Sequence, residues 1–154
     1  MSIIWKYLDK RAATIAAIKD YDSMAFIIKS TESKIEAIND KAISSGGMKL
    51  NDMPSSVHDP KAGEHRILAV IDQIDILQER FSQAQEYMAW FKPAWAQLTD
   101  EERYILKTFY SESSGYGCNA AYAIADKLNL EQAAVYKRKN RALSRLTVLL
   151  FGKE

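Results

Sequence analysis

Hydrophobic residues recur at alternating steps of three and four through the middle of the chain, a spacing typical of a helix that packs along another helix. All ten positions of this seam are apolar: Ile67, Val70, Ile74, Leu77, Phe81, Ala84, Met88, Phe91, Trp95 and Leu98. Asp59 and Pro60 form a start signal, because a carboxylate caps a helix and proline suits its first position. Pro93 removes a helical hydrogen bond, so we expect a kink near Lys92, within a hydrophobic hub of nearby aromatic residues.

The first 43 residues predict a second long helix with a less regular seam. Its apolar positions are Tyr7, Tyr21, Ile28, Ile35 and Ala42, with a companion row of Ile4, Ile18 and Ala25 that Arg11, Glu32 and Asn39 interrupt. Residues 44–59 are polar and rich in Gly, Ser and Asp, which predicts a loop. Two long helices joined by a loop predict an antiparallel hairpin. Apolar residues off the seam indicate self-association or packing on another domain: Trp5, Ile71, Ile76, Tyr87 and Trp90.

The last third of the chain has shorter elements. Thr99 is followed three residues later by Glu102, a capping box before an apolar run. Residues 111–118 predict a loop, and residues 119–128 a short helix. A turn at Asn129 leads to a final helix that runs to about Phe151 and ends at Gly152. The predicted fold class is therefore all-α, with a helical hairpin over 1–97 and a smaller helical domain over 98–154.

Residues 121–143 have the pattern of a helix-turn-helix. Ala125 lies where the two helices come closest, and Asn129 tolerates the positive φ of the turn. The predicted buried positions are Ile124, Leu128 and Leu130, then a stripe of Val135, Ala142, Leu146 and Leu149. The opposite face of the second helix carries Ala133, Tyr136, Lys137 and Asn140, with Gln132 and Arg141 at its borders. Short, polar and basic groups on such a face suit a DNA major groove.

The net charge of the whole chain does not favour DNA binding, but the charge of the segment around the predicted second helix does. The chain carries 21 Lys and Arg against 20 Asp and Glu, a net charge of +1 that argues against nucleic acid. Residues 1–100 hold 12 basic and 14 acidic residues, whereas residues 127–145 hold six basic residues and one acidic. The basic charge is therefore concentrated around the predicted second helix of the motif.

Three segments resemble region 4 of RNA polymerase sigma factors: Leu98 to Arg103, Ile124 to Leu130, and Ala142 to Leu146. The long hairpin, with Met53-Pro54 in its loop, resembles small phage and prophage regulators of late genes in Gram-positive bacteria, the ArpU/RinA-like proteins. The chain departs from the sigma pattern in four ways. Lys137, Arg138 and Lys139 are consecutive, so they spread around the helix and cannot all face one groove. Asn129 replaces a turn glycine, Glu131 replaces the Ser or Thr that caps the recognition helix, and the spacer before residue 121 is longer.

The resemblance and the basic face together predict a DNA-binding transcriptional regulator that is not an enzyme and needs no cofactor. We expect Gln132, Ala133, Tyr136, Lys137 and Asn140 to face base edges, and Lys127, Arg138, Arg141 and Arg145 to hold phosphates. The predicted partner is duplex DNA, bound by a dimer formed through the hairpin of 1–97. A second interpretation is an adaptor that binds RNA polymerase and has little DNA affinity. A third is a structural coiled-coil protein.

Other chemistry has little support in the sequence. Cys118 is the single cysteine, which excludes a disulfide scaffold and leaves no cysteine pair for zinc. His58 and His65 lack a third convergent ligand, so we expect no metal site, and we find no catalytic constellation. No apolar run approaches about 18 residues, and the start has no signal-peptide pattern. These features predict a soluble, cytoplasmic protein with no membrane partner.

Overall fold

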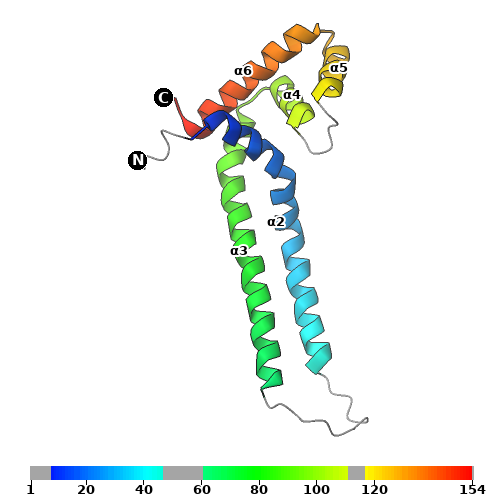
Figure 1. Cartoon of the computed structure of the whole chain (residues 1–154), viewed down its shortest axis with the longest axis vertical. Coiled ribbons are helices and arrows are strands. Elements are labelled where there is room, and N and C mark those ends of the chain that lie inside the picture. The colour runs from blue at the N-terminus through cyan, green and yellow to red at the C-terminus, as the bar shows by residue number, and fades with distance from the viewer. Residues whose placement is uncertain (1–7, 47–60, 111–116, 154) are drawn as a thin grey trace. The chain divides into compact units, whose positions relative to one another are not determined.

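The computed structural model describes residues 8–46, 61–110 and 117–153. Within these ranges the chain forms five helices and no strand, which confirms the all-α class (Figure 1). The helices are α2 (Lys10–Gly46), α3 (Ala62–Ala96), α4 (Asp100–Tyr110), α5 (Gly117–Leu128) and α6 (Gln132–Phe151).

Helix α2 begins and ends later than the sequence predicted. Asp9 precedes the helix, and its Oδ1 accepts a hydrogen bond of 3.0 Å from the Ala12 N–H, as a capping carboxylate does. The helix continues to Gly46, three residues into the predicted loop of 44–59. The predictions for residues 1–7, the remainder of that loop and the Asp59-Pro60 start signal lie outside the described residues.

The buried face of α2 also differs from the predicted seam. Thr31 is buried where the sequence placed an interruption at Glu32, and Ile38 is half-buried beside an exposed Asn39. In this part of the helix the buried row lies one residue earlier than the predicted companion row. The Glu32 and Asn39 side chains are therefore exposed to solvent. The Thr31 hydroxyl donates a 2.6 Å hydrogen bond to the Ile27 carbonyl, so its burial leaves no unsatisfied donor.

Helix α3 follows its predicted seam closely in its second half. Ala84, Met88, Phe91 and Leu98 are buried, and the helix continues through Pro93 to Ala96. The first half of the seam is much more open, and the side chain of Ile67 is 62% exposed. The helical period therefore identified the right face, but the burial of that face changes along α3.

The start of α4 is the predicted capping box. The Thr99 hydroxyl accepts from the Glu102 N–H at 3.2 Å, and the Glu102 carboxylate accepts from the Thr99 N–H at 2.9 Å. This reciprocal pair satisfies two backbone donors that a helix N-terminus otherwise leaves free. The first turn of α4 is thus fixed, and it carries three consecutive acidic residues, Asp100 to Glu102.

The turn between α5 and α6 has the backbone conformation that the sequence predicted. Asn129 has φ 51°, and the Leu130 N–H donates a 3.0 Å hydrogen bond back to the Ala125 carbonyl, which closes the end of α5. Glu131 stands at the start of α6 without a side-chain capping bond. Helix α6 ends at Gly152, whose φ is 78°.

The described residues pack as two compact units. One contains those of Met1–Met24 and Tyr87–Glu154, and the other contains those of Ala25–Glu86. Helices α2 and α3 both contribute to the core of the first unit. That core joins Ala17, Ile18, Phe91, Ala94, Leu98, Leu106, Ala142, Leu143 and Leu146. A smaller core of Ile105, Ile124, Ala125 and Val135 lies within the same unit.

Candidate functional site

The inner face of α6 holds the helix in the first unit and so determines which residues face outward. Val135, Ala142, Leu143 and Leu146 are fully buried. The predicted stripe is corrected at its end, because Leu149 is 41% exposed and Leu150 packs against the core instead. The positions at 143, 146 and 150 follow steps of three and four, so the buried face simply continues around the helix by its normal period.

The outward face of α6 carries a stripe of three exposed residues at steps of four. These are Ala133, Lys137 and Arg141. Neither Lys137 nor Arg141 makes a side-chain hydrogen bond or ion pair with any residue that the structure describes. Gln132, at the first position of the helix, is half-buried. The stripe therefore presents two cations beside a methyl group that allows close approach.

One flank of this stripe is neutralised by α4. Arg138 forms an ion pair with Glu101, and Arg145 forms one of 2.9 Å with Glu102. Arg145 also donates a 3.1 Å hydrogen bond to the Gln97 carbonyl. Both arginines were predicted to hold phosphates, and that role stays a prediction. In the structure, the acidic first turn of α4 lies against α6, and its carboxylates form ion pairs with two arginines of that helix.

The Glu102 carboxylate shows how these contacts affect ionisation. Burial raises its pKa, but the hydrogen bond from the Thr99 N–H and the neighbouring Arg145 guanidinium outweigh burial. The pKa of Glu102 is therefore lowered from its ordinary value of 4.5. At neutral pH this carboxylate is charged and holds both the helix cap and the arginine.

The other flank of the stripe is covered by the beginning of α2. Arg11 donates a 2.8 Å hydrogen bond to Oδ1 of Asn140, a predicted base-facing residue. The hydroxyls of Thr14 and Thr147 lie 2.9 Å apart, and Thr14 is fully buried. The sequence analysis predicted that Arg11 interrupts the apolar row of the first long helix. In the structure, Arg11 contacts Asn140 at the edge of α6.

Aromatic rings hold two further lysines of the basic segment. Lys139 lies 5.0 Å from the Phe109 ring centroid and 5.2 Å from that of Tyr136, and these rings are 5.8 Å apart. Burial and then the nearby Arg11 charge lower the pKa of Lys139. Lys127 lies 4.0 Å from the centroid of the Tyr104 ring. Cation–π contacts of this kind position an ammonium group without neutralising it.

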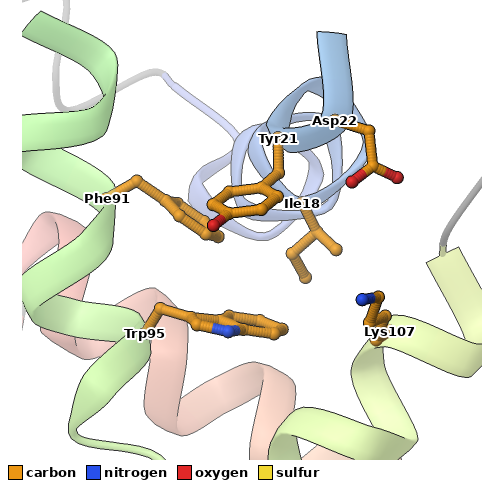
Figure 2. Close-up of a pocket in the computed structure, with 6 residues that line it drawn as sticks. All are labelled: Ile18, Tyr21, Asp22, Phe91, Trp95 and Lys107. Carbon is orange, nitrogen blue, oxygen red and sulfur yellow. The ribbon is translucent and has the colours of Figure 1, made fainter. Parts of the chain in front are cut away.

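In the predicted aromatic hub around Pro93, Phe91 and Trp95 pack in the core of the first unit, whereas Trp90 is 41% exposed. The Phe91 ring lies 5.4 Å from Trp95 and 6.5 Å from Trp90. Figure 2 shows a small cavity beside it, of about 130 Å³, with Asp22 and Lys107 on the side away from Phe91. A volume of this size holds a few water molecules or one small ring, as expected for a gap in packing.

The structure offers no candidate for other chemistry in the ranges it describes. Among those residues, no three His, Cys, Asp or Glu side chains gather closely enough to hold a metal ion. His58 lies outside them. No described helix combines the length and the apolar character needed to cross a lipid bilayer. The most distinctive polar surface in the described residues is therefore the outward face of α6 with its two flanks.

Comparison with protein family models, with curated proteins and with solved structures finds no match for this chain.

Proposed function

We propose that the protein is a sequence-specific DNA-binding regulator in which α4, α5 and α6 act as a sigma-region-4-like helix-turn-helix and α6 is the recognition helix. The observation that carries this proposal is the exposed stripe of Ala133, Lys137 and Arg141, whose two cations have no partner among the described residues. The sharp turn at Asn129 and the buried Ala125 support the helix-turn-helix assignment.

The dimensions of the stripe suit a major groove. Arg141 follows Ala133 by eight positions, about 12 Å along the helix axis, and the helix with its side chains is about 10–12 Å in diameter. A groove about 12 Å wide admits a helix, with a small residue near the base edges and long cations toward bases or phosphates. Tyr136 and Asn140 lie at one border of the stripe, where an amide can recognise an adenine edge.

The same contacts limit the strength of binding. Because Arg138 and Arg145 are paired with carboxylates of α4, fewer cations are available than the sequence count suggests. Each phosphate contact contributes about 0.9 to the slope of log K against log salt concentration. We therefore expect modest affinity and a shallow salt dependence for one copy of the chain.

Selection of duplexes from a random pool tests this proposal. The parent protein should enrich a defined sequence, and Lys137→Ala with Arg141→Ala should enrich none. The matched control is Lys19→Ala with Lys29→Ala, which removes the same charge from exposed positions of α2. Enrichment of the same sequence by both double variants would exclude α6 as the recognition helix.

We also propose that two copies associate through an apolar groove in the Ala25–Glu86 unit. The groove has a volume of about 820 Å³, and its apolar lining includes Ile38, Ala42, Ile67, Val70, Ile71 and Ile74. Four polar or charged residues also line it: Asn39, Lys41, Arg66 and Gln73. That volume is several times a single side chain, so a partner helix fits it better than one inserted residue. A dimer would present two recognition helices to two half-sites.

The charges of this unit favour a second copy over a membrane surface or a strongly charged partner. Its described residues include six Lys and Arg and eight Asp and Glu, so both signs are present in similar number. A two-fold interface pairs a surface with itself, so the Lys41 and Arg66 side chains that line the groove would meet the Asp and Glu side chains around the partner's groove. Helices that lie on anionic membranes instead carry an excess of Lys and Arg.

A polymerase-binding adaptor is the second candidate function. The ion pairs of Arg138 and Arg145 favour it, because they reduce the charge available for DNA. Retention on core RNA polymerase in the absence of DNA would support this candidate. Absence of retention, together with sequence-specific DNA binding, would exclude it. A late-gene role in a phage or prophage rests on the sequence resemblance, and adjacent terminase or portal genes would support it.

A further inference from the structure

Arg11 is held at the edge of α6 by the first turns of α2. Asp9 caps the helix, and Thr14, three residues after Arg11, is fully buried beside Thr147 of α6. One turn further, Ala17 and Ile18 belong to the main core of the unit. The Arg11 backbone is thus fixed by buried neighbours, while its side chain remains exposed.

Arg11, like Arg141 of the same unit, has no acidic partner among the described residues. Arg138 and Arg145 both pair with carboxylates, but no described carboxylate lies within ion-pair distance of Arg11. Its hydrogen-bond partner is the neutral Asn140 amide at 2.8 Å. The pKa of the adjacent Lys139 is lowered first by burial and then by the Arg11 charge. Two cations side by side without an anion are unfavourable, and a bound anion would relieve their repulsion.

We propose that Arg11 binds a phosphate of the DNA backbone next to the bases that α6 contacts, so that the start of α2 is a second DNA-binding element. This proposal rests on the proposed function of α6. Arg11 lies beside the outward stripe of α6 rather than on it, which suits a backbone contact more than a base contact. A guanidinium has five N–H donors, and the bond to Asn140 uses one. The remaining donors can hold a phosphate in the two-pronged geometry that arginine favours.

The competing explanation is that Arg11 only orients Asn140. A double-mutant cycle separates the two roles, since a positioning residue has no effect once its target is removed. The variants are Arg11→Ala, Asn140→Ala and the double variant. Arg11→Lys keeps the charge without the planar fork, and Lys19→Ala is a matched control for loss of one exposed cation from α2. Binding is measured by fluorescence anisotropy on the duplex that the parent enriches, at several salt concentrations.

We expect Arg11→Ala to lower the salt slope by about 0.9 and the affinity at 0.1 M salt by about eightfold, the effect of one lost phosphate contact. The same changes should appear in the Asn140→Ala background, Arg11→Lys should restore the slope, and Lys19→Ala should match the parent. Melting temperatures of all variants should agree, because exposed substitutions change stability by about 0.5 kcal/mol or less. If Arg11→Ala melts early, Arg11→Gln replaces it, since glutamine removes the charge but keeps more of the aliphatic side chain than alanine does.

An unchanged slope in Arg11→Ala, or an effect that vanishes in the Asn140→Ala background, would overturn the proposal while leaving α6 as the recognition helix. Failure of the parent to bind any duplex would overturn the proposed function together with this inference. The two failures are therefore distinguished by the parent protein alone.

Discussion

Neutralising the two carboxylates of α4 that pair with α6 should strengthen DNA binding. Glu101→Gln with Glu102→Gln removes the charges that hold Arg138 and Arg145. The amide at position 102 still accepts the Thr99 N–H, because glutamine also completes a capping box. The side chains of the two ion pairs are partly exposed, and Glu102 is the most covered at 19%, so their loss should lower the free energy of unfolding by about 1 kcal/mol each or less.

The size of the effect follows from counterion release. One additional phosphate contact makes the slope of log K against log salt concentration steeper by about 0.9. If the contact contributes nothing at 1 M salt, it raises the binding constant at 0.1 M salt by about eightfold. Two released arginines therefore give a ceiling of about sixtyfold and a slope steeper by about 1.8. The bond from Arg145 to the Gln97 carbonyl persists in the variant, so we expect a gain of about tenfold or more, below that ceiling.

The assay is fluorescence anisotropy on the enriched duplex between 0.05 and 0.3 M salt, roughly the range in which the slope is measurable. The control is Glu36→Gln with Glu64→Gln, which removes two exposed carboxylates from the other compact unit. This control measures the general gain from a less negative protein. If the two double variants bind equally and with equal slopes, the reasoning about released arginines is wrong.

Three further predictions concern stability, ionisation and assembly. Tyr87→Phe should lower the free energy of unfolding by about 1 kcal/mol in a thermal melt, because the half-buried hydroxyl donates to the Ala17 carbonyl; an unchanged melting temperature would exclude that bond. The pKa of Glu102 is lowered in the folded protein, so this carboxylate stabilises the fold above its unfolded pKa near 4.5, and that stabilisation is lost as the pH falls through the folded pKa. Glu102→Gln should therefore make the free energy of unfolding less dependent on pH in the acid range. Identical acid unfolding curves for the parent and the variant would contradict this. Ile71→Asp should convert a dimer to a monomer by light scattering, whereas Ile76→Asp, at an equally exposed position outside the groove, should not; a parent that is itself monomeric would refute the groove assignment.

Features that depend on a few neighbouring residues could be predicted from the sequence. The capping box of Thr99 and Glu102 and the positive φ of Asn129 are determined within three or four residues of chain. The stop at Gly152 is of the same kind. In each case one backbone conformation satisfies the local hydrogen bonds, so the residue types are sufficient to identify it.

Faces that depend on more than one neighbouring helix were predicted less well. The three- and four-residue spacing placed Tyr87 outside the contact between the two long helices. In the structure, the centroid of its ring stacks 5.3 Å from that of Phe91, and its hydroxyl donates to the Ala17 carbonyl of α2. Leu149 was predicted buried, yet the core uses Leu143 and Leu150. A helical period gives the direction of one apolar face. It does not show how wide that face becomes when a second helix packs beside the first.

The flanks of the candidate site could not be read from sequence spacing. Arg138 pairs with a carboxylate 37 residues away, and Arg11 reaches an amide 129 residues away. The sequence shows that six basic residues lie in 127–145, but it does not show that Arg138 and Arg145 are paired with carboxylates of α4. The acidic first turn of α4 was visible in the sequence as Asp100 to Glu102, and its position against α6 required the fold.

The most direct test of the central claim is the affinity of Lys137→Ala with Arg141→Ala for the duplex that the parent enriches. If α6 is the recognition helix, the loss of the Arg141 phosphate contact should make the slope shallower by about 0.9 and weaken binding about eightfold at 0.1 M salt. The loss of the Lys137 base contact should weaken binding further and relax the sequence preference. The control, Lys19→Ala with Lys29→Ala, should bind as the parent does. Equal affinity of the two double variants would contradict the account, because the exposed stripe of α6 would then have no role in binding DNA.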